Sequence, residues 1–541
     1  MSAILSAQDL NDFIGPGLAC INPVVVNKSE TNGPTEIQID ASGNPVEVSF
    51  DGTSSSNTKT ATQLTPAQIN LSDCLACSGC ITSAESVLVS LQSHTELLSV
   101  LRQSRGHIDT EDVSDIDTKR QKRIFVASIS HQSRASLAAA YNISVDSVDA
   151  KLMTLFRDIL GFQYLVGTGL GRQISLAYSA QEVLLKSAKF ADIDTQSAGR
   201  ETPVLASICP GWICYVEKTH PHVLPYLSAI KSPQQITGSL LKRLISEETG
   251  APADEIYHVS VMPCFDKKLE ASRPDFATGE GVRDVDCVIT TKEVVQLLID
   301  ENIDFMTITE SEDAHGEIFH AMAPKLWPTE KSWESSEGSS SGGYLWHVLA
   351  ALGDEITKTE GKSASLKVIP GKNSDMVEYN LVVATDGNHE QVVAKAAQVY
   401  GFRNIQNLVR KLKTGGKTGA RPVVASRTKK SAGGATATLM PTEYDYVEVM
   451  ACPGGCINGG GQIGAPPTDA GDVIGLKEWR DIVENKYKSM RSSSVERQAV
   501  QEWVATVWGS DIDSLVTTSY RAVEGLDTKD AVPAVLVGDK W

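Results

Sequence analysis

Short apolar runs alternate with amphipathic segments over most of the chain from residue 123 onward. Runs rich in Val, Ile, Phe or Tyr at residues 124–130, 204–208, 256–262 and 444–450 predict buried strands. Further strands are predicted at residues 285–290, 366–369 and 380–384, and helices at residues 84–101, 135–141, 292–300, 344–352, 391–413, 477–489 and 497–508. This alternation predicts an α/β fold with mostly parallel sheets, whose functional loops lie at the carboxyl ends of the strands.

Polar stretches suggest where this pattern is divided into domains. Residues 27–66 are rich in Ser, Thr and Asn and predict a surface insertion, while residues 414–438 are basic and rich in Gly and predict a flexible insertion. The predicted units are an N-terminal domain at residues 1–102, a linker at 103–122, the main α/β region at 123–475, and C-terminal helices with a tail at 476–541.

Composition narrows the class of protein. The 541 residues carry a formal net charge of −18, and such an acidic surface argues against nucleic acid as the main partner. No apolar run approaches the roughly 20 residues of a membrane span. The first residues, MSAILSAQDLNDFIGPG, lack the basic region of a signal peptide and the arginines of a mitochondrial presequence. We therefore expect a cytosolic protein without a membrane span.

Three cysteines at C-x2-C-x2-C spacing predict a metal cluster near the N-terminus. In a chain without a secretory signal, grouped cysteines favour metal binding over disulfides. Cys74, Cys77 and Cys80 have the spacing that wraps three corners of an iron-sulfur cubane, whereas zinc sites usually combine separated pairs. Ala84 stands where a ferredoxin has its next ligand, so Cys20, which lies upstream after a turn, is the candidate for the fourth corner.

A second group of cysteines lies at the ends of predicted strands. Cys452 and Cys456 have C-x3-C spacing in the glycine-rich loop at residues 449–462, and Cys209 and Cys264 each follow a strand. Since parallel strands bring such ends together, the pattern predicts a second site with four thiolates. The alternative is a glycine-rich turn with two incidental buried cysteines.

Other features are interpreted as structural. Cys214 and Cys287 are expected to be core residues. Residues 416–418 resemble the end of a phosphate-binding loop, but Lys411 replaces its first glycine, so a linker is expected there. Residues 167–171 lack the last glycine of a dinucleotide-binding fingerprint and predict a turn.

The segments around the second cysteine group resemble the three signature segments of iron-only hydrogenases. They are Cys209-Pro210-Gly211-Trp212, residues 262–270 and residues 450–462, and the resemblance covers about residues 123–465. It implies a two-lobed hydrogenase-like α/β fold with a small N-terminal iron-sulfur domain.

The same resemblance implies roles for individual residues. In that family the cysteines matching Cys209, Cys264, Cys452 and Cys456 hold a 4Fe-4S cubane, and the last also bridges to a two-iron centre with carbonyl and cyanide ligands. Lys267 matches a lysine that contacts a cyanide. Two methionines match pocket residues of the hydrogenases, Met262 and Met450.

One position departs from the hydrogenases. Ile208 stands where they have a cysteine that delivers protons to the two-iron centre, and an aliphatic side chain cannot relay a proton. Together with Cys20 and the single N-terminal cluster, this departure resembles the eukaryotic hydrogenase-like assembly factors of the cytosolic iron-sulfur protein machinery, also called nuclear prelamin A recognition factor-like proteins. That family matches nearly the whole chain.

This second resemblance implies a non-catalytic protein with two 4Fe-4S clusters. One is bound by Cys20, Cys74, Cys77 and Cys80 and the other by Cys209, Cys264, Cys452 and Cys456. Such proteins connect an early P-loop NTPase scaffold to a late targeting complex with a WD40 propeller, and serve client apo-proteins indirectly. They are cytoplasmic, with the nucleus as a second compartment. An active iron-only hydrogenase and an iron-sulfur electron carrier are the alternatives.

The last residue has its own interpretation. Trp541 resembles the aromatic C-terminus that the targeting complex reads, although Lys540 replaces the acidic or small residue often found before it. An incidental terminal tryptophan remains the alternative.

Overall fold

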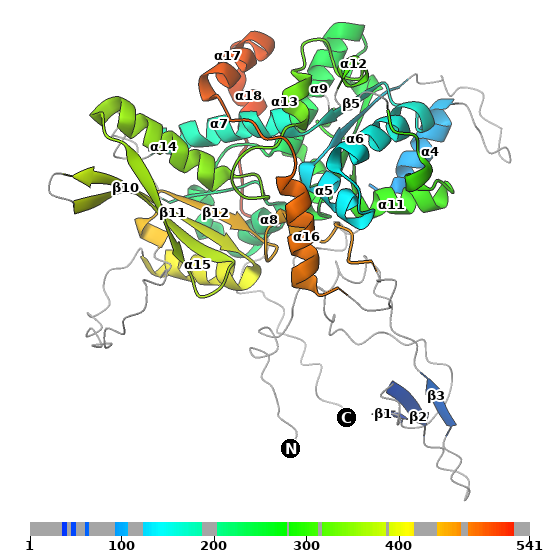
Figure 1. Ribbon diagram of the computed structural model, residues 1–541, viewed down its shortest axis with the longest axis horizontal. Coiled ribbons are helices and arrows are strands. Elements are labelled where there is room, and N and C mark those ends of the chain that lie inside the picture. Colours follow the sequence, from blue (N-terminus) through cyan, green and yellow to red (C-terminus); the bar gives the residue numbers. More distant parts are fainter. Residues whose placement is uncertain are drawn as a thin grey trace, which may run out of the picture. The chain divides into compact units, whose positions relative to one another are not determined.

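A computed structural model gives the fold (Figure 1). It describes residues 35–39, 45–49, 60–63, 92–105, 123–186, 203–277, 281–311, 316–385, 389–415, 441–466 and 474–523. The predicted features outside these ranges are the ligands Cys20, Cys74, Cys77 and Cys80, residues 416–418, and Trp541. Contacts divide the chain into two compact units, Met1–Ser86 and Val87–Trp541.

Within the first unit, the described residues form a small antiparallel sheet. Its strands are β1 (Thr35–Ile39), β2 (Pro45–Ser49) and β3 (Thr60–Gln63), in the order β1-β2-β3. They lie in the stretch that the sequence predicts to be a polar insertion.

A parallel sheet forms the centre of one lobe of the second unit. Its order in the described chain is β5-β4-β7-β8. Its strands are buried almost throughout, as expected of parallel strands covered on both faces. The strands are β4 (Ile124–Ile129), β5 (Tyr164–Gly167), β7 (Ile256–Met262) and β8 (Cys287–Thr290). The strands predicted at residues 124–130, 256–262 and 285–290 are confirmed.

The other lobe contains a mixed sheet. Over the described residues its order is β6-β12-β11-β10-β9, and β6, β12 and β11 are parallel while β10 and β9 are antiparallel to their neighbours. The strands are β6 (Val204–Leu205), β9 (Ala364–Pro370), β10 (Met376–Thr385), β11 (His389–Tyr400) and β12 (Tyr446–Met450). The prediction of mostly parallel sheets therefore holds fully for the first lobe and partly for the second.

The helix predicted at residues 391–413 is confirmed from residue 402 onward and wrong for residues 391–400. The chain instead forms strand β11, bends at Gly401, which has φ +80°, and then forms helix α15 (Phe402–Gly415). Ala, Gln and Lys in this stretch favour a helix locally. Pairing of β11 with β12 on one side and β10 on the other overrides that preference, because the last residues of β11 are mostly buried between these two strands.

Helices cover both sheets. In the first lobe and between the lobes lie α4 (His94–Arg105), α5 (His131–Ala140), α6 (Val145–Thr154), α7 (Gly169–Lys186), α9 (Pro233–Thr249), α10 (Asp266–Ala271), α11 (Thr291–Asp300), α12 (Glu317–Ala321), α13 (Thr329–Trp333), α16 (Leu476–Lys488), α17 (Arg497–Trp508) and α18 (Ile512–Val516). The second lobe contains α8 (Pro210–Thr219), α14 (Tyr344–Glu360) and α15. Figure 1 shows α16 running between the lobes, where it packs on α5.

Short helical turns join these elements. A π-helical turn covers Leu155–Ile159, and 3-10 turns cover Pro221–Tyr226, Ala253–Glu255, Pro274–Phe276, Phe305–Thr307, Pro441–Glu443 and Cys456–Asn458.

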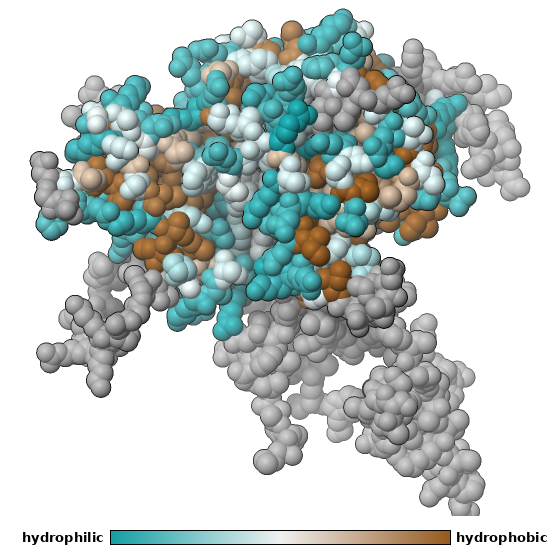
Figure 2. All heavy atoms as spheres, viewed as in Figure 1, coloured by the Kyte–Doolittle hydropathy of each residue, from teal (hydrophilic) through white to brown (hydrophobic). Residues whose placement is uncertain are grey.

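The surface on the viewed face mixes hydrophilic and hydrophobic residues over both lobes (Figure 2). Scattered exposed apolar residues are normal for a folded protein, so their presence does not locate an interface. A search of the helices in the described ranges finds none with the length and apolarity needed to cross a membrane.

The turn predicted at residues 167–171 is confined to Thr168, and the glycines on either side of it serve close packing. β5 ends at Gly167, and α7 begins at Gly169. A Cβ on Gly167 would lie 2.2 Å from the carbonyl oxygen of Ser332, and one on Gly171 would lie 2.2 Å from Thr237 Oγ1. Side chains there would force neighbouring segments apart.

His258 in β7 makes the stability of this lobe sensitive to acid. Its ring is fully buried, with Nε2 2.9 Å from Ser128 Oγ and Nδ1 3.1 Å from the Asp284 carbonyl oxygen. Its pKa is lowered to about 3, because burial and, to a lesser extent, the Lys242 charge lower it more than the bond to the Asp284 carbonyl raises it. In the unfolded chain the pKa is near 6.5.

As the pH falls, His258 takes up a proton in the unfolded chain at a higher pH than in the folded protein. The free energy of unfolding should therefore fall below about pH 6.5, and this group contributes up to about 1.4 kcal/mol per pH unit. We expect His258→Gln to be less stable at pH 7 but to lose this part of the pH dependence. Urea unfolding of both proteins between neutral and mildly acidic pH measures it. Equal slopes for the two proteins would contradict this role of His258.

Candidate functional site

The cysteines predicted to form the second site follow three strands from both sheets. Cys209 caps the start of α8 just after β6, Cys264 follows β7, and Cys452 and Cys456 follow β12. Since β6 and β12 are adjacent in the second lobe and β7 lies in the first, the site lies between the lobes at carboxyl ends of strands. The structure thus brings these four predicted residues together.

Close contact between two loops brings Cys264 near Cys452. Gly461 N–H donates to the Pro263 carbonyl at 3.0 Å. A Cβ on Gly459 would lie 2.4 Å from the same carbonyl oxygen, so only glycine allows this approach. Glycine is therefore needed in this loop, because two backbone segments are in close contact beside the cysteines.

A serine from a third loop holds Cys456. The backbone N–H of Cys456 donates to Ser341 Oγ at 3.0 Å. The preceding Gly455 has φ +85°, and a Cβ there would lie 2.2 Å from the same hydroxyl oxygen. Ser341 could not be identified from the sequence, because it lies 115 positions from Cys456 along the chain.

Backbone N–H groups point at the sulfur atoms. The Ala451 N–H donates to Cys209 Sγ at 3.4 Å, and the Trp212 N–H bonds to the same thiol. The Gly460 N–H bonds to the thiol of Cys452. Hydrogen bonds of this kind stabilise a thiolate and tune the potential of a cluster attached to it.

The electrostatics of the site disfavour ionised thiols unless positive charge is added. Burial raises the pKa of all four thiols, to about 12 for Cys456. At Cys264 the negative charges of Asp266 and of the other three thiolates raise it further. Burial also raises the pKa of the Asp266 carboxyl. Iron ions would supply the missing positive charge, so this donor set fits a cationic metal cluster.

The donors at this site are four thiols. Across the described ranges, no group of three or more His, Cys, Asp or Glu side chains converges as the ligands of one ion would. A cubane differs, because each thiolate binds a different iron atom and the sulfur atoms stand farther apart. The donor set, four cysteine thiols, is the one that a 4Fe-4S cubane uses.

Lys267 is held by neighbours within the protein. Its Nζ donates to the Ile208 carbonyl at 3.0 Å and to Glu270 Oε2 at 2.7 Å. The other oxygen of Glu270 accepts from Ser232 Oγ at 2.5 Å and from the side-chain amides of Gln234 and Gln235 at 3.3 Å. The lysine charge is thus balanced by a buried carboxylate.

Aliphatic and thioether groups surround this polar network. Ile208 is buried, with 8% of its surface exposed, directly before Cys209. Met450 Sδ lies 3.7 Å from Cys456 Sγ, and Met262 is buried at the end of β7. The side chain at position 208 offers no proton donor or acceptor.

The remaining described cysteines differ from these four. Cys287 is buried in β8, as expected of a core residue, and burial raises its pKa to about 12. Cys214 lies on α8 and is half-buried, so it is less enclosed than predicted.

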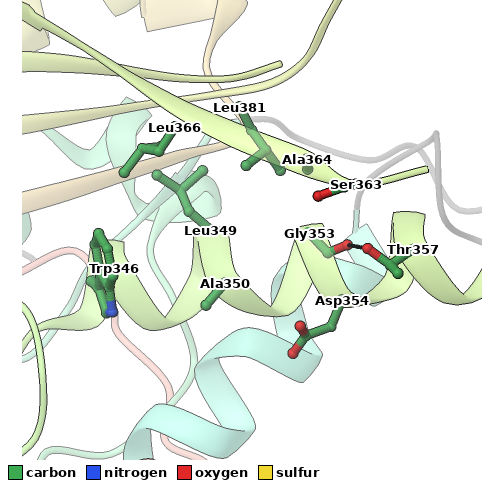
Figure 3. Close-up of a pocket in the computed structure, with 10 residues that line it drawn as sticks. All are labelled: Trp346, Leu349, Ala350, Gly353, Asp354, Thr357, Ser363, Ala364, Leu366 and Leu381. Atoms are coloured by element: carbon green, nitrogen blue, oxygen red, sulfur yellow. Dashed lines mark hydrogen bonds between the residues drawn. The ribbon is translucent and has the colours of Figure 1, made fainter. Parts of the chain in front are cut away.

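A separate cavity of about 340 Å³ lies in the second lobe between α14 and the strands β9 and β10 (Figure 3). Leu349, Leu366 and Leu381 point into it, and Trp346 stands at one end. No cysteine lines it. The cavity is therefore distinct from the cysteine site.

Comparison with known proteins defines the class first. Residues 123–460 match the family model for the iron only hydrogenase large subunit, C-terminal domain. The structure of apo [FeFe]-hydrogenase HydA1 from Chlamydomonas reinhardtii aligns with a TM-score of 0.55 at 20% identity, covering 80% of this chain and 99% of that one. The predicted two-lobed iron-only-hydrogenase-like fold is confirmed.

Closer relatives then define the family. The chain is 51% identical to a protein from Yarrowia lipolytica over 97% of this chain and 99% of the relative, and 43% identical to one from Scheffersomyces stipitis over 100% of both. Both relatives are named cytosolic Fe-S cluster assembly factor NAR1. The chain belongs to this family of cytosolic Fe-S cluster assembly factors.

The loop at Gly455 gives a test of the site geometry. We expect Gly455→Ala to push the Cys456 loop away from Ser341, because a side chain meets both an unfavourable φ and the hydroxyl, at a cost of about 1–3 kcal/mol. Iron and sulfide contents of the purified protein should fall by the share of one cluster.

Gly464→Ala is the matched control, since a Cβ at Gly464 has no atom within 4 Å. It should keep the iron content of the unmodified protein. Full iron content in Gly455→Ala would show that Cys456 does not depend on this contact.

Proposed function

We propose that this protein is a non-catalytic component of the cytosolic iron-sulfur protein assembly machinery that carries two 4Fe-4S clusters. Membership of the assembly-factor family supports the process and the cytosolic compartment. The predicted ligands of one cluster are Cys20, Cys74, Cys77 and Cys80, and those of the other are Cys209, Cys264, Cys452 and Cys456.

The observation that carries the proposal is the convergence of Cys209, Cys264, Cys452 and Cys456 directly beside an aliphatic residue. The four thiols support retention of a cubane between the lobes. Ile208 argues against proton delivery to any group bound next to Cys456, because its side chain has no titratable atom.

When bound, a 4Fe-4S cluster supplies one-electron chemistry and mechanical cross-linking of the loops that hold it. The protein positions the ligand loops and stabilises the charge on the sulfur atoms. Ser341 orients the Cys456 loop, and the N–H groups of Ala451 and Gly460 stabilise negative charge on two sulfur atoms. Lys267 fixes the segment before Cys209 by bonding the Ile208 carbonyl.

Within the machinery, we place the protein between an early P-loop NTPase scaffold and a late targeting complex that contains a WD40 propeller. Client apo-proteins are then served indirectly. Trp541 is the candidate for contact with the targeting complex.

An active hydrogenase is the second candidate, because Lys267, Met262 and Met450 match hydrogenase pocket residues. The aliphatic Ile208 argues against it. Loss of a general acid-base group costs a factor of about 10²–10⁴ in rate.

Replacing one ligand tests the cluster between the lobes. We expect Cys264→Ser to lose about half of the iron and sulfide, since a site for four thiolates keeps three, and to reduce the activity of cytosolic iron-sulfur enzymes in cells. Cys214→Ser, on helix α8 directly after Cys209, should preserve both the iron and sulfide content and the activity of the client enzymes. Normal client activity in cells that carry Cys264→Ser would contradict the proposed role.

Replacing Cys20 tests the predicted fourth ligand of the other cluster. Cys20→Ala should lose the N-terminal cluster, keep the signals of the cluster between the lobes, and impair maturation of the same client enzymes. Unchanged iron content would remove Cys20 from the proposed ligand set.

A further inference from the structure

Helix α15 presents a basic face to solvent. Its buried face consists of Ile405, Leu408, Val409 and Leu412 at helical spacing. The exposed basic residues of the helix are Arg403, Arg410, Lys411 and Lys413. No Asp or Glu occurs in α15, so its exposed charges all have one sign.

This concentration of charge is unusual for the chain as a whole. The formal net charge is −18, yet the sequence from residue 402 to residue 440 contains no Asp or Glu. Its basic residues are Arg403, Arg410, Lys411, Lys413, Lys417, Arg421, Arg427, Lys429 and Lys430. The positive sign therefore continues in the sequence beyond the described end of the helix.

Aromatic rings lie beside the basic face. The ring of Phe402, at the start of α15, packs edge-on against Tyr215 of α8 with centroids 5.6 Å apart, and 39% of Phe402 is exposed. The Tyr215 ring also lies 4.8 Å from that of His220, which is followed by the exposed His222. The charge of Lys413 reaches His220, so the rings and the basic face are neighbours.

Both elements lead directly to the cysteine site. Cys209 directly precedes α8, and α15 follows Gly401, whose N–H donates to the Met450 carbonyl at 2.9 Å. Gly401 also lies against Pro453, the residue after Cys452. A partner bound here would contact the elements that hold two of the predicted ligands.

We propose that this surface docks a partner protein through a segment rich in Asp and Glu that also carries an apolar anchor. We call it the α15 surface and define it by Arg403, Arg410, Lys411 and Lys413 together with Phe402, Tyr215, His220 and His222. The proposal does not depend on the function proposed for the cysteine site.

Charge complementarity and composition both favour this occupant. Lys and Arg of one sign attract an acidic segment and steer its approach. Arg and aromatic residues are enriched at the centres of protein interfaces, where they contribute most of the binding energy. The strongly acidic remainder of the chain repels a long polyanion such as duplex DNA, whereas a short acidic segment reaches only the α15 surface.

The experiment measures binding of the full-length protein to a fluorescent peptide of Glu and Asp with one central Leu, by anisotropy at low and physiological salt. We expect binding that weakens with salt, because the Debye length shortens to about 8 Å at physiological ionic strength. Replacing the Leu with Glu should also weaken binding. Absence of any binding at low salt would overturn the proposal.

Charge reversal locates the site. Arg410→Glu combined with Lys413→Glu should weaken peptide binding at least about tenfold. The matched control is Arg102→Glu combined with Lys488→Glu, which changes net charge equally at exposed positions of α4 and α16. It should change binding less than about threefold, and circular dichroism and thermal unfolding should show both variants folded.

Several outcomes would overturn the assignment. Equal weakening in both double variants would mean that only net charge matters. Duplex DNA or anionic phospholipid vesicles bound more tightly than the peptide, with loss in Arg410→Glu/Lys413→Glu, would assign the surface to another class of partner.

Discussion

Placing the thiols of Cys209, Cys264, Cys452 and Cys456 together between two lobes is electrostatically costly, and the surrounding structure is built around that cost. Burial and mutual repulsion raise the pKa of each thiol. The protein supplies hydrogen bonds to the sulfur atoms and the charge of Lys267 near Cys209 and Cys456, but burial outweighs both, so the ionised state depends on added positive charge. The close approach of the glycine-rich loop at residues 449–462 to Pro263 holds the cysteines from the two lobes in place.

The same scaffold serves different chemistry in different proteins. The hydrogenase-like fold is retained, while the side chain at position 208, directly before Cys209, is aliphatic and buried. Lys267 donates to Glu270 and to the Ile208 carbonyl, and so fixes the chain before Cys209. A fold therefore constrains where a site lies more than what the site does.

Much of this arrangement could be predicted from the sequence. The strands β4, β7 and β12 are buried almost throughout, so their apolar runs are unambiguous. Cys209 and Cys452 follow adjacent parallel strands of one sheet, whereas Cys264 follows a strand of the other sheet. Strand β11 was missed because its helix-favouring residues are overruled by pairing with β12, which lies far along the chain. Ser341 and Asp266 were missed for a similar reason, since their roles arise from contacts between distant loops or from burial.

The central claim is that the four thiols between the lobes hold a cubane without an attached two-iron centre. An anaerobic infrared spectrum of the iron-replete protein, with iron and sulfide counted on the same sample, tests it most directly. The account predicts no iron-bound carbonyl or cyanide stretches and enough iron and sulfide for two cubanes. Such stretches would contradict it, because they would place a two-iron centre beside Cys456 despite Ile208.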